Sequence, residues 1–187
     1  MTGAIARLIW ELERNRKEAD ALTAGLSAKA FNWRPEPNKW SIGQCLHHLA
    51  LFNEPDLPHL DRAIADARSK GWLHPGPYDY GFLTPLFIAS IEPPPRNRFP
   101  APGGFLPPAA DLSLATTLGR YHEVTETLIR RLRDADGLDL GKAHTALPVL
   151  PLLKMPLGGR FALLAAHDRR HLWQAKQVRH HPAFPQI

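Results

Sequence analysis

Two histidines near the C-terminus, His167 and His171, are spaced so that both could bind one metal ion. They are four residues apart in a segment whose apolar residues repeat with helical periodicity. Side chains at this spacing lie one above the other on a helix, with Cβ atoms about 5–6 Å apart. Both imidazoles can therefore reach a common ion, although two hydrogen-bonded histidines in a helical core would show the same spacing.

A third metal ligand is needed, because reactive sites typically combine three protein ligands with one position for water or substrate. His48 is the best candidate: it belongs to an apolar helical segment and shares a side with Phe52. His47 points about 100° away, since each residue of a helix turns by that angle. One histidine from an early helix and two from a late one would form a three-nitrogen site between helices, which suits zinc, nickel, copper or iron.

Three other polar residues are weaker candidates for a catalytic role. Gln44 lies one turn before His48 and could hydrogen-bond a ligand or a bound substrate. Asp168 follows His167 directly, but about 100° around the helix, so we expect a surface ion pair with an arginine or, alternatively, a contact behind a ligand. Glu123 could approach the open side of the ion, although exposure to solvent is the main expectation for it.

Four segments have the apolar periodicity of amphipathic helices and carry helix-terminating signals. Ser41 is a good N-cap for the second helix, and Pro55 and Pro58 should kink or split it. Asn15 and Tyr121 are polar groups in otherwise apolar seams, so they could lie near the ion or fix the helix register. With no convincing alternating strand, the sequence predicts an all-α four-helix bundle, with helices over about 5–26, 42–69, 112–133 and 157–179.

Residues 71–109 differ in composition from these helices and form a predicted insertion between the second and third. Prolines and glycines crowd this stretch, which predicts irregular structure, but its many aromatic residues are unlike those of a flexible linker. We expect it to pack over one end of the bundle as a lid or substrate wall. A second proline-broken stretch covers 141–156, and residues 1–187 are expected to form one domain.

Charge and cysteine content narrow the possible partners and the compartment. The formal net charge is +5, but the basic residues are scattered among nearly as many acidic ones, which disfavours a nucleic-acid binder. The chain shows no signal peptide and no apolar stretch long enough for a membrane span, so no membrane partner is expected. A lone cysteine, Cys45, cannot form an intrachain disulfide and favours the cytoplasm; we interpret it as a small buried residue.

Two motifs together resemble the signatures of the DinB-like superfamily, a family of bacterial metalloproteins. Residues 31–50 contain a proline loop, then Trp-Ser opening a helix, then a histidine eight residues after Trp40, which is His48. Residues 167–174, HDRRHLWQ, match the second signature, a His-x-x-x-His helix followed by a glutamine. The resemblance implies an up-down-down-up four-helix bundle with one long crossover, metal ligation by His48, His167 and His171, and pairing as a homodimer.

The resemblance also implies a class of chemistry. Members of the superfamily include metal-dependent transferases that use low-molecular-weight thiols, thiol-dependent isomerases and proteins classed as hydrolases. We therefore expect a metal-dependent enzyme, a thiol transferase or a hydrolase, that acts on a small molecule with zinc or nickel bound and a low-molecular-weight thiol as cosubstrate. The alternative is a non-catalytic metal-binding or ligand-sensing bundle.

Overall fold

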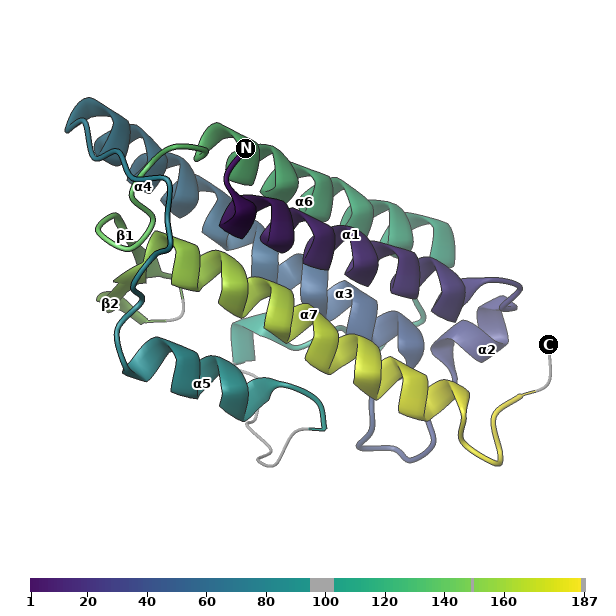
Figure 1. The fold of residues 1–187 in the computed structure, drawn as a ribbon. Helices are drawn as coiled ribbons and strands as arrows, with labels where there is room; N and C mark the ends of the chain where they lie inside the picture. Colours follow the sequence, from purple (N-terminus) through teal and green to yellow (C-terminus); the bar gives the residue numbers. More distant parts are fainter. Residues whose placement is uncertain (95–102, 149, 186–187) are drawn as a thin grey trace.

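Four long helical segments lie side by side in the computed structural model, which describes residues 1–94, 103–148 and 150–185 (Figure 1). Helices α1 and α7 run in one direction, whereas α3, its continuation α4, and α6 run in the opposite one (Figure 1). The described residues are thus mostly helical, as the apolar periodicity predicted. The bounds are α1 (Gly3–Thr23), α3 (Ile42–Asn53), α4 (Leu57–Ser69), α6 (Leu114–Asp134) and α7 (Leu157–Arg179), with a short α2 (Ala28–Asn32) between the first two.

The predicted second helix is split, and its start and its break follow from local sequence. Ser41 and Gln44 form a capping box: the Ser41 hydroxyl accepts from the Gln44 N–H, and the Gln44 side chain accepts from the Ser41 N–H, both at 3.1 Å. Pro55 lies in a turn of 3₁₀-helix, η1 (Glu54–Asp56), that separates α3 from α4. The prediction of a break at the prolines is therefore confirmed.

Apolar side chains from all four segments meet in a core with two main parts. Helices α1 and α3 each pack against both α6 and α7. This mutual packing brings α3 and α7, the helices that carry the three candidate ligands, into contact. The largest buried side chains include Ile5, Leu12, Leu60, Leu128 and Phe161 in one part and Phe31, Ile42, Leu46, Leu49 and Tyr121 in the other.

The predicted insertion is more ordered than its composition indicated. It contains α5 (Leu83–Ile91), which packs against α7, and a 3₁₀ turn, η2 (Gly103–Phe105). Figure 1 shows α5 alongside α7 on the side away from α6. This helix was not predicted, because it contains Pro85. Pro85 lies in the first turn of α5, however, where a proline is tolerated. The other described residues of the insertion, 71–82, 92–94 and 106–109, contain no helix or strand, and residues 95–102 lie outside the described part of the chain.

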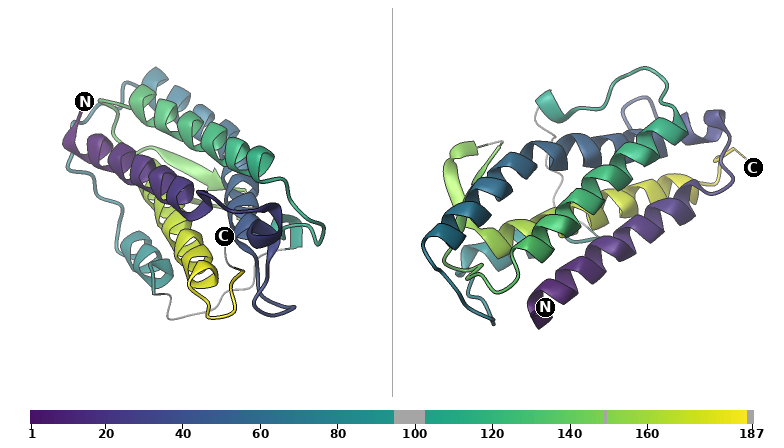
Figure 2. Two further views of the ribbon diagram at one scale, coloured as in Figure 1. Left: turned by 90° about the vertical axis from the view of Figure 1, so that its right-hand side faces the viewer. Right: turned by 90° about the horizontal axis from the view of Figure 1, so that it is seen from above.

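The expectation of an all-α protein without strands is wrong for residues 144–156. Strands β1 (His144–Leu147) and β2 (Leu150–Pro156) form an antiparallel two-stranded sheet in which Thr145 is opposite Met155. Both residues are buried, whereas His144 is exposed, so an alternating pattern exists but is very short. Figures 1 and 2 place this sheet at the end of the helices where α7 begins. None of the helices in the described ranges is long and apolar enough to cross a bilayer.

Candidate metal centre

The side chains of His48, His167 and His171 converge between α3 and α7. One potential ligand atom from each lies within 4.8 Å of the other two. The Nε2 atoms of His48 and His167 are 3.4 Å apart. Two nitrogens bound at about 2.0–2.1 Å to one tetrahedral ion would be separated by about 3.3–3.4 Å. The spacing of these two atoms therefore fits a shared ion.

Hydrogen bonds fix which nitrogen of two of the rings is available to a metal. The Nδ1 of His48 lies 2.7 Å from the main-chain oxygen of Phe105, and the Nδ1 of His171 lies 3.1 Å from Oε1 of Gln174. Because these oxygens only accept, each Nδ1 carries the proton and each Nε2 keeps its lone pair. This tautomer, held by a partner behind the ring, is the usual arrangement of metal-binding histidines.

His167 differs from the other two histidines in its hydrogen bonding. Its Nδ1 is buried and has no hydrogen-bond partner in the described part of the chain. A buried nitrogen without a partner costs free energy in the absence of a compensating interaction. The unpartnered Nδ1 is separate from the shared point, because the nitrogen of His167 that faces His48 is Nε2.

Burial keeps all three rings neutral at physiological pH. Loss of hydration lowers the pKa of His48, His167 and His171, for His171 to about 3. The neighbouring charges that act in the same direction are cationic, including Arg160 and Arg170. Metal ligation requires unprotonated imidazole, so the surroundings prepare the rings for that role before any ion arrives.

Aromatic side chains enclose the three imidazoles. The Trp40 ring stacks on His171 with centroids 5.5 Å apart, and the Phe52 ring lies 4.1 Å from that of His167. Phe105, from η2, packs against Phe52 at 5.3 Å. Trp40, the tryptophan of the first motif, therefore packs on two of the histidines themselves.

Asp168 does not form the predicted surface ion pair. Its side chain is fully buried and accepts hydrogen bonds from Asn53 Nδ2 at 2.9 Å and from the Tyr121 hydroxyl at 3.1 Å. Burial raises the pKa of Asp168 to about 7, although both hydrogen bonds oppose this shift. The prediction failed because α7 is covered on several sides, so a residue 100° from the ligands is still inside. Tyr121, the polar group predicted in the apolar seam of its helix, thus hydrogen-bonds to the residue that directly follows His167.

The other two catalytic candidates are engaged elsewhere. Gln44 closes the capping box of α3, and its Nε2 donates to the main-chain oxygen of Pro108 at 2.9 Å. It therefore holds the returning end of the insertion against α3. Glu123 is exposed on the surface of α6 and forms an ion pair with Arg120. Solvent exposure was the main expectation for it.

A buried ion pair beside the histidines was missed by sequence reasoning. The Arg160 guanidinium donates to both oxygens of Asp56, at 2.6 and 2.5 Å, and both side chains are almost inaccessible. Arg160 also lies over the Phe52 ring, which in turn contacts His167. Arg160 lies two helical turns before His167 on the same helix face, and a charged residue at such an inward position could have indicated a buried ion pair.

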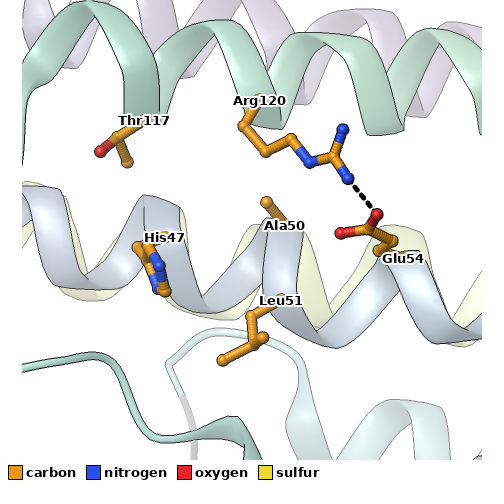
Figure 3. Close-up of a pocket in the computed structure, with 6 residues that line it drawn as sticks. All are labelled: His47, Ala50, Leu51, Glu54, Thr117 and Arg120. Atoms are coloured by element: carbon orange, nitrogen blue, oxygen red, sulfur yellow. Dashed lines mark hydrogen bonds and ion pairs between the residues drawn. The ribbon is translucent and has the colours of Figure 1, made fainter.

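His47 points away from the candidate centre, as predicted, and lines a separate small cavity between α3 and α6 (Figure 3). This cavity has a volume of about 150 Å³ and is crossed at one end by the ion pair of Glu54 with Arg120. Typical small-molecule sites measure about 300–1,000 Å³. The cavity is therefore too small to replace the histidine cluster as the main candidate site.

Comparison with known proteins agrees with the geometry of the site. Residues 11–175 match the family model of the DinB superfamily, a range that contains all three histidines. The chain has no significant match among curated proteins or among solved structures.

Proposed function

Because the chain belongs to the DinB superfamily, a metal-binding family, we propose that it is a metal-dependent enzyme that transfers a low-molecular-weight thiol to a small molecule. His48, His167 and His171 would hold one divalent transition metal ion, zinc or nickel in the first instance. The scaffold would be a four-helix bundle of up-down-down-up order, in keeping with the directions of α1, α3, α6 and α7.

The observation that carries this proposal is the convergence of three neutral imidazoles with no fourth protein ligand among the described residues. Structural zinc sites are closed by four protein ligands, whereas reactive sites keep a position open. Cys45, the one thiol of the chain, is fully buried, and burial raises the pKa of its thiol. An exogenous ligand is therefore expected at the open position.

The electrostatics of the site favour an anionic ligand there. A divalent ion supplies a Lewis acid that lowers the pKa of a coordinated thiol or water. The three histidines are neutral and carry no charge to offset such an ion, whereas the charge of Arg160 is balanced by Asp56. The positive charge that stabilises a bound thiolate would therefore be that of the ion.

Proton transfer distinguishes the thiol reaction from hydrolysis. A metal-assisted hydrolase commonly uses a carboxylate within reach of the attacking water. Asp168 is committed to Asn53 and Tyr121, and Glu123 lies on the surface with Arg120. Among the described residues, no free carboxylate lies beside the imidazoles. A thiol is more acidic than water, so its deprotonation at the metal depends less on such a base than that of water does.

The test is thiol binding to protein loaded with cobalt(II), whose spectrum reports sulfur coordination. We expect a thiolate-to-cobalt absorption band on adding glutathione or cysteine, and consumption of that thiol with an electrophile such as an epoxide or alkyl halide. His48→Ala should lose both while its circular dichroism is unchanged, and His47→Ala should keep both. Thiol binding without turnover would favour the non-catalytic alternative, and ester cleavage without thiol binding would favour a hydrolase.

A further inference from the structure

His167 is the one candidate ligand whose ring is not oriented by a hydrogen bond at Nδ1 in the described part of the chain. The Nδ1 atoms of His48 and His171 are held by the main-chain oxygen of Phe105 and by Gln174. The Nδ1 of His167 is buried without such a partner there, and its Nε2 faces the shared point. Metal-binding histidines are ordinarily oriented through the nitrogen that does not bind the ion. Another contact must therefore fix the plane of this ring.

Phe52 supplies a flat contact to the ring of His167. The two ring centroids are 4.1 Å apart and the ring planes are inclined by 32°, so one ring lies largely over the other. Among the described residues, the other ring contacts of His167 are with His48 and His171, which are candidate ligands themselves. Phe52 lies one turn after His48 on α3. The helix that carries one ligand therefore also packs on the ring of another.

The buried ion pair restrains Phe52 in turn. The Arg160 guanidinium lies over the Phe52 ring, 5.6 Å from its centroid, which is within the range of a cation–π interaction. Asp56 holds that guanidinium through two hydrogen bonds, a geometry that fixes its orientation. Consecutive contacts thus run from Asp56 through Arg160 and Phe52 to His167.

We propose that Phe52 is a positioning residue for His167, and that the pair of Arg160 with Asp56 keeps Phe52 in place. The ring contact does for this imidazole what hydrogen bonds do for the other two. The inference rests on the metal centre of the proposed function and not on the reaction performed there. A buried ion pair is by itself weak evidence for stability, and orientation of a metal ligand gives this pair a role. Loss of the Phe52 ring should therefore weaken metal binding more than it weakens the fold.

Zinc affinity of the full chain, measured by competition with a chromophoric chelator, tests this proposal. Phe52→Leu should lower the affinity by about 10–100-fold, the usual effect of changing a residue that orients a metal ligand. Phe52→Tyr keeps the ring and should retain most of the affinity. The matched control is Phe161→Leu, which removes a buried ring of α7 from the other part of the core and should bind zinc as wild type does. Wild-type affinity in Phe52→Leu overturns the proposal, whereas a wild type that binds no zinc overturns the proposed function as well.

The double variant R160M/D56L gives an independent answer should Phe52→Leu fold poorly. It replaces the buried pair with apolar side chains, an exchange that often leaves stability unchanged. Its zinc affinity should nevertheless fall about tenfold or more, because the guanidinium no longer holds Phe52. The visible absorption of bound cobalt(II), which reports coordination geometry, should change in the same way in R160M/D56L and in Phe52→Leu. Wild-type affinity and a wild-type cobalt spectrum in R160M/D56L would contradict the assignment of this role to the ion pair.

Discussion

The Nδ1 atom of His48 donates a hydrogen bond to the main-chain oxygen of Phe105 at 2.7 Å, and this bond joins a candidate metal ligand to the insertion. Two further side chains of the same region reach main-chain oxygens farther along: Gln44 bonds to Pro108 and Asn32 to Leu112. The returning end of the insertion is thus held by three side chains of α2 and α3. Ordering of this segment and orientation of the His48 ring are coupled.

Zinc should slow hydrogen exchange in residues 103–112. Metal binding fixes the His48 ring, and a fixed ring strengthens the hydrogen bond to Phe105, so local opening of the segment becomes less frequent. Hydrogen–deuterium exchange with mass spectrometry, with and without zinc, measures this. His48→Ala should show no zinc-dependent protection, and protection confined to α7 would show that the coupling is absent.

Arg160→Met should destabilise the fold by about 3–5 kcal/mol, because it leaves the buried Asp56 without its partner. Urea unfolding followed by circular dichroism gives the value. Changing both residues, R160M/D56L, should recover most of the loss. The matched control is Arg131→Met, which breaks an exposed pair with Asp61 and should cost less than about 1 kcal/mol. Equal costs for the two single variants would show that burial does not make the Arg160–Asp56 pair more important to stability than the exposed pair.

Asp168→Ala should lower the free energy of unfolding by about 2–4 kcal/mol and leave metal stoichiometry intact. The substitution removes the acceptor of two buried donors, Asn53 Nδ2 and the Tyr121 hydroxyl. Tyr121→Phe removes only one hydrogen bond and should cost about 1 kcal/mol. Loss of the metal in Asp168→Ala at unchanged helicity would show that Asp168 acts on the ligands directly.

Stability should decline at alkaline pH as buried tyrosines ionise. Burial raises the pKa of Tyr80 to about 12, and that of Tyr121 well above its ordinary value. An unfolded tyrosine titrates near pH 10, so the folded state holds these protons more tightly. The stabilisation is complete below about pH 10 and is lost as pH rises toward 12.

Phenolate absorbance measures this effect directly. In native protein, Tyr80 and Tyr121 should titrate later than in denaturant, and Tyr80→Phe should remove one of the late transitions. Native and denatured titration curves that superimpose would refute the prediction.

The helices and the three histidines were predictable because periodicity and motif spacing are local properties of the sequence. The capping box at Ser41 and the break at Pro55 follow equally local rules. The hydrogen bonds of Asp168 and the pair of Arg160 with Asp56 were not predictable, because each joins side chains on different helical segments, 47 to 115 residues apart. The short sheet was missed because only Thr145 and Met155 carry its inward pattern.

The most direct test is the metal content of untagged protein, measured by elemental analysis after equilibration with zinc and removal of unbound ion. Wild type and His47→Ala should each bind one zinc per chain. His48→Ala, His167→Ala and His171→Ala should each retain helicity and lose most of the bound ion. A full equivalent of zinc in His48→Ala would contradict the shared three-histidine centre.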